Sequence, residues 1–304
     1  MAIMTRAQFA KSLQDGLNAH FGLEYSDYPE EFSRVFDVET SEKAYEEDVL
    51  LVGFGYASEK AEGGEYAEDQ GQEGWTKRYT HRIVALSFQV TEEAIEDNRY
   101  MSLGAKYSRA LARSMRQTKE VYAANVLNNA TDSGYTGGDG KSLLATDHPL
   151  VGGGTASNML ATAADLSESS LEQILIQVRK AKDDRGLPKM IKAMQLIVAP
   201  DNEYNARRIL GSDKQPGTAN NDINAIKSKS VFGNEPVVLT NLTDPDAWFV
   251  KTDCPEGLKV LNRTKLVMPK VTIDSKTGNF LYRARERYSE GWTDWRSVYG
   301  SMGA

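Results

Sequence analysis

"TEEAIEDNRYMSLGAKYSRALARSMRQTKEVYAANVLNNA", residues 91–130, is the longest regular pattern in the chain. Thr91 can cap a helix, carboxylates follow it, and basic residues come later, an order that suits the helix dipole. Apolar side chains recur at helical spacing, at Tyr107, Leu111, Met115, Tyr122 and Val126. The pattern predicts a helix from 91 to about 129, roughly 58 Å long. Its single apolar stripe predicts that it lies across a sheet, with its basic residues solvated or paired at the surface.

Two apolar segments precede this helix and flank an acidic one. "LLVGFGYAS", residues 50–58, and "KRYTHRIVALSFQV", residues 77–90, both predict strands. Between them, "EKAEGGEYAEDQGQEGWT", residues 59–76, has almost nothing to bury. A loop of this length is either disordered or functional. In the second case it is a long hairpin that projects towards a partner.

The chain after the long helix alternates helix and strand patterns. Residues 165–184 predict a helix that begins with a capping box from Ser169 and Glu172. "MQLIVAP", 194–200, predicts a buried strand, and "DNEYNARRIL", 201–210, begins another helix. This alternation indicates a small α/β domain.

The last third of the chain predicts mainly strands. We expect them near "PVVLT", "AWFVKT" and "GLKVL". Residues 269–288 predict a hairpin that turns at Ser275–Gly278. "YRARERYSEGWTDWRSVYG", 282–300, could suggest base stacking with phosphate contacts. Because carboxylates interrupt the basic run, we interpret it as an edge strand and a packed terminus.

Composition excludes several classes of protein. The chain has 304 residues, of which 40% are hydrophobic and 26% charged, as in ordinary globular proteins. No apolar run is long enough for a membrane span, and we expect no secretory signal. The lone Cys254 excludes a disulfide framework within one chain and fits a reducing cytoplasm. A net charge of −7 argues against a dedicated nucleic-acid binder.

The sequence offers few candidates for chemistry. "SGYTGGDGKS", 133–142, resembles a phosphate-binding loop, but Tyr135 stands where the first glycine is needed. No two histidines have metal-ligand spacing. Asp147 and His148 could be half of a catalytic triad, yet no serine lies in a GxSxG turn, and a turn before Pro149 explains them better. We therefore expect no catalytic, cofactor-binding or metal-binding residues.

Three stretches of the sequence then indicate a family. "VYAANVLNNA", 121–130, is followed by "GKSLLATDHPLVGGGTASN", 140–158, and the chain closes with "RARERYSEGWTDWRSVYGS", 283–301. With the order of hairpin, long helix, α/β domain and returning strand, these segments resemble the major capsid proteins of tailed bacteriophages, with local similarity to Mu-like prophage head subunits. The resemblance covers about residues 35–304 and implies the α+β fold named after the Hong Kong 97 phage.

The resemblance implies a division of the chain. Residues 1–49 would be an N-terminal arm and 50–90 an extended hairpin, the E-loop. Residues 91–164 would be a peripheral domain with its spine helix at 91–130. Residues 165–260 would be an axial domain, with 211–230 as a loop near the capsomer axis. Residues 261–304 would return to the peripheral domain.

The resemblance also implies a structural function without catalysis. Subunits would self-assemble into pentamers and hexamers of an icosahedral head, which encloses double-stranded DNA and contacts it weakly and without sequence specificity. Assembly would occur in the host cytoplasm, with a separate scaffolding protein, a portal and a decoration protein as further partners. The alternatives are an α/β hydrolase using Asp147 and His148, or a phage-encoded binding or scaffold module.

Contacts between subunits are expected along the acidic hairpin. The candidate residues are Glu59, Lys60, Glu65, Glu68, Asp69, Trp75 and Lys77. Some members of the family join a lysine to an asparagine covalently between subunits. The match fixes neither Lys60 nor Lys77 for that role, and we expect no cross-link.

Overall fold

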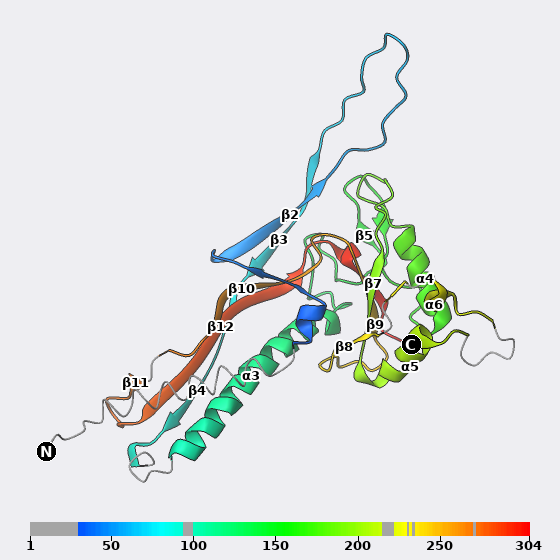
Figure 1. Ribbon diagram of the computed structural model, residues 1–304. Coiled ribbons are helices and arrows are strands. Elements are labelled where there is room, and N and C mark those ends of the chain that lie inside the picture. Colours follow the sequence, from blue (N-terminus) through cyan, green and yellow to red (C-terminus); the bar gives the residue numbers. More distant parts are fainter. Residues whose placement is uncertain (1–29, 94–99, 215–221, 230, 233–234, 270–271) are drawn as a thin grey trace.

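The computed structural model describes residues 30–93, 100–214, 222–229, 231–232, 235–269 and 272–304. It is a mixed α+β fold, as predicted. Figure 1 shows three parts: a long helix lying along one sheet, a second sheet with shorter helices beside it, and a hairpin that projects from the body. No helix among the described residues is both long and apolar enough to cross a bilayer.

The long helix α3 spans Tyr100–Asn128. Its end agrees with the prediction, whereas the expected first turns, at 94–99, lie outside the described residues. Leu111 and Met115 are buried and pack against Ala284 of the first sheet. The C-terminal end of the helix enters a second, larger core through buried Leu127. α3 therefore connects the two sheets.

Two basic residues of α3 lie deeper than predicted. Arg116 and Lys119 are both buried, because their charged ends lie between the helix and the segments that pack against it. Arg116 contacts the Glu30 carboxylate at 2.5 Å, and Lys119 donates a hydrogen bond to Asn262.

The first sheet has the strand order β1-β10-β12-β11, with β4 pairing on β12. Its strands are β1 (Asp37–Thr40), β4 (Arg82–Val90), β10 (Leu258–Val267), β11 (Thr272–Ile273) and β12 (Phe280–Trp292). The predicted turn before β12 is confirmed, and Gly278 has the positive φ that the turn requires. In the interpretation of 282–300 as an edge strand and a packed terminus, the edge strand is wrong, because β12 pairs with β10 on one side and with β4 on the other. The packed terminus is confirmed, since residues 291–300 are all buried.

The hairpin consists of β2 (Tyr45–Val52) and β3 (Gln72–Thr80). The expected strand at 50–58 therefore ends early, and the expected strand at 77–90 is two strands that separate at His81. The physical reason is a change of partner: β3 pairs with β2, whereas β4 pairs with β12. The buried imidazole of His81 contacts the hydroxyl groups of Ser41 and Ser289 at this change.

The second sheet has the order β13-β9-β7-β8. Its strands are β7 (Ala193–Val198), β8 (Val237–Val238), β9 (Trp248–Thr252) and β13 (Val298–Ser301). Helices α4 (Glu168–Arg179), α5 (Glu203–Gly211) and α6 (Ala225–Ser228) accompany it. The expected α/β alternation is confirmed. Most of the expected loop at 211–230 lies outside the described residues or in α6.

The capping box of α4 begins two residues before the predicted one. Ser167 caps the helix and Ser170 completes the box, instead of Ser169 and Glu172. The buried Ser170 hydroxyl also donates to the Asp165 carbonyl, a contact that glutamate at 172 cannot make.

The chain ends in the second sheet. β12 lies against α3, but β13 pairs with β9, so segment 261–304 returns to the long helix only in part. The remaining short elements are η1 (Phe32–Arg34), β5 (His148–Pro149), β6 (Thr155–Ala156), η2 (Pro200–Asn202) and η3 (Trp295–Ser297).

Candidate assembly surface

The segment that joins β2 to β3 has little to pack on. In the hairpin register, Val52 lies opposite Gln72, and residues 53–71 between them form no strand. We call residues 53–71 the tip loop. Apart from half-buried Gly55, every residue in it is exposed, because its glycines and carboxylates provide no apolar face. Figure 1 shows it standing clear of the body.

A few polar contacts shape the tip loop. The Asp69 carboxylate accepts a hydrogen bond of 2.8 Å from the Gly55 amide and lies 2.7 Å from the Arg185 guanidinium. The Gly55 amide and then the Arg185 charge hold the pKa of Asp69 below its ordinary value. The Lys60 ammonium lies 4.6 Å from the centre of the Tyr66 ring. These contacts are exposed and therefore weak.

The tip loop also exposes large apolar groups. Phe54 is 61% exposed, Tyr56 71% and Tyr66 82%. Aromatic side chains are enriched in protein interfaces. Carboxylates stand beside them, which gives the loop both apolar and acidic character. The tip loop therefore has the chemistry of a contact surface.

The structure separates the predicted contact residues into two groups. Glu59, Lys60, Glu65, Glu68 and Asp69 lie on the tip loop. Trp75 and Lys77 lie on β3 and contact their own chain.

Lys77 is partly buried, and this burial lowers its pKa. Its ammonium donates a hydrogen bond of 2.5 Å to the Thr136 carbonyl and lies 5.2 Å from the centre of the Trp292 ring. Trp75 is half-buried beside Gly138. These two side chains fasten the base of the hairpin to the body. Arg185, which binds the tip loop, carries no signal in the sequence, since it lies in an ordinary polar turn.

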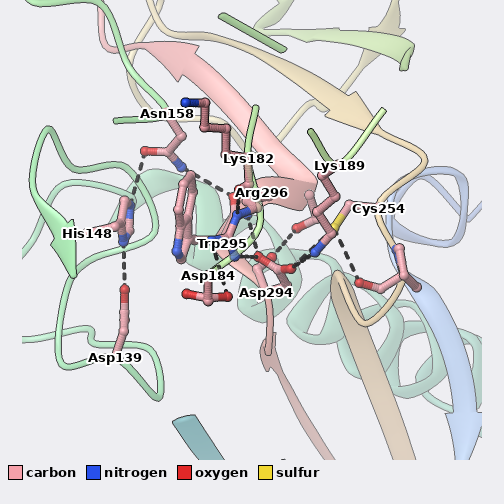
Figure 2. A network of polar contacts seen from close by, with 12 residues as sticks. Asp139, His148, Asn158, Lys182, Asp184, Lys189, Cys254, Asp294, Trp295 and Arg296 are labelled. Carbon is pink, nitrogen blue, oxygen red and sulfur yellow. Dashed lines mark hydrogen bonds and ion pairs between the residues drawn. The ribbon is translucent and has the colours of Figure 1, made fainter. Parts of the chain in front are cut away.

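Asp147 and His148 do not form a catalytic pair. Asp147 is exposed and pairs with Lys141 at 2.5 Å, whereas the His148 side chain is fully buried. Figure 2 shows the His148 ring between Asp139 and Asn158, with Nδ1 2.6 Å from Asp139 and Nε2 3.1 Å from Asn158 Oδ1. The face of the His148 ring stacks on the Trp295 ring, with 4.2 Å between the ring centres. Both nitrogens are occupied, so this histidine holds the loop in place.

The same network continues to the C-terminus. Asp294 is buried between Arg296 and Lys189, as Figure 2 shows. Burial opposes ionisation of this carboxylate, but the two cations outweigh it and lower its pKa. Burial raises the pKa of the adjacent Cys254 thiol to about 12, which removes it as a nucleophile at neutral pH. The network therefore has a structural role, because its ion pairs connect Asp294 and Arg296 to Lys189.

The described part of the chain shows no cluster of His, Cys, Asp and Glu suited to a metal ion. Residues 133–142 follow α3 directly, and the Lys141 ammonium is engaged by Asp147. They do not lie between a strand and a helix N-terminus, where a phosphate loop would.

Comparison with known proteins places these features in a family. The family described as phage capsid protein matches residues 76–301. Among curated proteins, none matches this sequence.

Solved capsid structures share the fold at low sequence identity. The capsid of cyanophage P-SCSP1u has 10% identity and a TM-score of 0.57, with 89% of this chain and 86% of that chain covered. Mycobacterium phage Che8 has 14% identity and a TM-score of 0.55, covering 90% and 92%. The procapsid of bacteriophage JBD30 has 16% identity and a TM-score of 0.53, covering 98% and 76%.

At these identities the structures establish the fold, and the family match covers most of the sequence. The geometry agrees, since the described residues include a projecting, exposed loop and bury the candidate catalytic histidine His148. The chain belongs to the phage capsid protein family and is a structural subunit of a virion.

Proposed function

We propose that this chain is the subunit from which pentamers and hexamers of an icosahedral head are built around double-stranded DNA. The observation that carries this proposal is the tip loop, which exposes three aromatic side chains and gains little from its own subunit. A monomeric enzyme has no use for such a loop. Neighbours from assembled particles, such as the JBD30 procapsid, support self-assembly.

The elements fit the Hong Kong 97-type division of the chain. The residues before β1 would be the arm, which is shorter than the 1–49 expected because β1 and β2 already belong to sheets, and β2, β3 and the tip loop would be the E-loop. α3 would be the spine helix of a peripheral domain that also includes the first sheet. The second sheet with α4–α6 would be the axial domain at the centre of each capsomer.

The hairpin would act as a clasp between neighbouring subunits. Its backbone can add to a neighbour's sheet edge, and its side chains can pair with basic groups there. A single exposed ion pair contributes about 0–1 kcal/mol. A closed shell repeats each contact in every subunit, so weak contacts add up. The clasp thus strengthens the shell without stabilising the free subunit.

Other components would act beside this subunit. A separate scaffolding protein, a portal and a decoration protein would join assembly in the host cytoplasm. The acidic subunit would contact packaged DNA weakly, which lets DNA move during packaging. Catalysis has no part in this function, and no covalent cross-link is proposed, since Lys77 is engaged with Thr136 and Trp292 of its own chain.

Negative-stain microscopy of the expressed full chain tests the proposal. We expect rings of five or six subunits, tubes or closed shells. Monodisperse monomers under every assembly condition, including co-expression with the other head proteins, would contradict it. Turnover of a substrate that is lost in His148→Ala would restore the hydrolase alternative.

A further inference from the structure

A cavity opens beside the second sheet, between α4, the start of β7 and α6. Figure 1 shows α4 and α6 close together on one side of β7. The cavity has a volume of about 610 Å³, within the range of sites for small molecules. Its floor consists of four buried aliphatic side chains of the main core: Val178, Ile191, Ala193 and Ile226. We call it the aliphatic pocket.

The walls of the aliphatic pocket leave apolar surface uncovered. Ile176 of α4 is 53% exposed, and Leu175 and Val231 are only half-buried. Among the residues that the structure describes, no aromatic ring lines the pocket. A flat aromatic ligand would therefore find no ring to stack on, whereas a flexible alkyl chain can contact branched aliphatic side chains along its whole length. The lining favours an aliphatic ligand.

Four cationic side chains surround the aliphatic pocket. They come from three elements, since Arg179 and Lys180 lie at the end of α4, Lys192 precedes β7 and Lys229 follows α6. All four are exposed, and in the described part of the chain none of them has an ion-pair partner. Positive charges gathered around one pocket repel each other, and an anion between them relieves the repulsion. The cations favour a ligand with a negatively charged head group.

The charges along α4 give the aliphatic pocket a direction. Glu172, Ile176 and Arg179 line it at helical spacing, with the carboxylate at one end and the guanidinium at the other. Seven positions separate Glu172 from Arg179, about 10.5 Å along the helix axis. An extended alkyl chain of about eight to ten carbons covers this distance, at about 1.25 Å per bond in a zigzag of 1.5 Å bonds. An anionic head group fits the Arg179 end, whereas the Glu172 carboxylate opposes a second anionic group at the other end.

Hydrogen bonds fix the walls of the aliphatic pocket in place. Buried Asn224 caps α6 by accepting from the amides of Ile226 and Lys227, and its own amide donates to the Ile209 carbonyl. The amide of Lys192 donates to the Asp253 carboxylate at 2.7 Å, which holds the start of β7. The pocket is therefore formed before any ligand enters, and binding does not have to order its walls.

We propose that the aliphatic pocket binds a free aliphatic anion of the fatty-acid class, about eight to ten carbons long. Its carboxylate lies between Arg179 and Lys192, and its chain runs along α4 towards Glu172, over Ile176 and the buried floor. This inference goes beyond the proposed function, because one subunit contains the whole site and binding does not require a shell.

Isothermal titration of the full chain with decanoate, kept below its micelle concentration, tests the inference. We expect saturable binding, with an affinity that rises about two- to fourfold per CH₂ group from hexanoate to decanoate, because each methylene leaves water. Decyltrimethylammonium has the same chain with a cationic head group, and decanedioate brings a second carboxylate to Glu172. Each should bind about tenfold more weakly than decanoate, because like charges then meet.

Variants of the lining give the matched comparison. Arg179→Ala with Lys192→Ala should weaken decanoate binding about tenfold, since both contacts to the head group are lost. Ala225→Trp, at an exposed lining position, should fill the cavity and abolish binding. Lys265→Ala with Lys276→Ala removes two exposed, unpaired lysines in and beside the first sheet and should bind like the wild type.

Thermal melting without ligand confirms that each variant is folded. Added decanoate should raise the melting temperature of the wild type and of the lysine control, because a ligand stabilises the state that binds it. It should leave the melting temperature of Ala225→Trp unchanged. Glu172→Gln should narrow the gap between decanedioate and decanoate, a change that a purely structural role of Glu172 would not produce.

Three outcomes would overturn the inference. The first is that decanoate does not bind, and the second is that decyltrimethylammonium binds equally well, as in adsorption of any detergent. The third is that Ala225→Trp binds decanoate like the wild type. Co-sedimentation with phosphatidylglycerol vesicles that is lost in Arg179→Ala with Lys192→Ala would instead show a membrane-binding surface, and it would also overturn a site for the free anion. None of these results depends on shells, so this inference and the proposed function can fail separately.

Discussion

An oxygen of the Glu290 carboxylate lies 2.5 Å from a guanidinium nitrogen of Arg82, and the glutamate side chain is 5% exposed. The second carboxylate oxygen is buried without a hydrogen-bond partner. Burial, only partly offset by the Arg82 charge, raises the pKa of Glu290 to about 7. The ion pair joins the start of β4 to β12, close to the base of the hairpin.

Because the pKa of Glu290 is raised, we expect the unfolding free energy of the protein to depend on pH. The folded pKa of Glu290 is above its ordinary value of 4.5, so protonation stabilises the folded state. That contribution is fully present below about pH 4.5 and is lost as pH rises through about 7. Glu290→Gln keeps a neutral group, so the stability of the variant relative to wild type should increase between pH 5 and pH 8, by roughly 2.5 kcal/mol.

Urea unfolding of both proteins across this pH range measures the effect. Glu47→Gln is a suitable control, because Glu47 makes a similar arginine contact, 2.6 Å from Arg78, on the exposed hairpin. A pH profile of Glu290→Gln parallel to that of the wild type would disprove the assignment.

Replacing the tip loop should separate folding from assembly. Val52 and Gln72 are paired, so an Asn-Gly turn can take the place of residues 53–71. The change removes only exposed contacts and shortens a loop, which costs little stability. We expect a folded subunit with a melting temperature within a few degrees of the wild type, and no shells. Because residues 72–76 belong to β3, a deletion of 59–76 would remove strand pairs and should destabilise the subunit.

His148 should affect stability and not catalysis. His148→Ala removes a stacked ring and the contact to Asp139 Oδ2, while Asn158 Oδ1 keeps only the hydrogen bond from the Ala145 amide. We expect a loss of about 2–4 kcal/mol in unfolding free energy. Asp147→Ala breaks only an exposed pair with Lys141 and should cost less than about 1 kcal/mol. Chemical denaturation compares them, and equal effects would contradict the separate roles.

Gly300 permits the close packing of β13 on β9. A Cβ atom there would meet the Trp248 carbonyl oxygen at 2.5 Å, which the backbone cannot relieve. Gly300→Ala should therefore lower the melting temperature by several degrees or prevent folding. Gly211→Ala, at the end of α5 with open space around it, is the control and should be neutral. Similar melting curves for both variants would argue against this contact.

Purified subunits should bind duplex DNA weakly. The net charge of −7 opposes binding to a polyanion. In about 0.15 M salt we expect affinities no tighter than micromolar in gel-shift or anisotropy assays. Submicromolar binding under these conditions would contradict this prediction.

Much of the local structure could be predicted from the sequence. The apolar stripe at Leu111 and Met115 predicts a helix on a sheet, because four-residue spacing places both side chains on one face. The run at Leu196–Val198 predicts a buried strand, because consecutive apolar residues suit a strand that is covered on both faces. The acidic composition of 59–71 likewise predicts a segment that cannot bury itself.

The sequence did not predict which strands would pair. His81 interrupts an apolar alternation that continues through it, and only the different partners of β3 and β4 divide the strand there. The basic run in β12 suggested an edge strand, but pairing on both sides makes it central. Pairing is non-local, so no single segment contains the information that selects it.

The sequence alone determined the helix and strand periods, the exposed acidic loop and the absence of a recognisable catalytic motif. The tertiary structure alone decided that Trp75 and Lys77 fasten the hairpin and that His148 is buried away from Asp147. Periodicity depends on residues that are close in the chain. Burial and charge pairing depend on which distant segments meet, as Lys77 meets Thr136 and Asp69 meets Arg185.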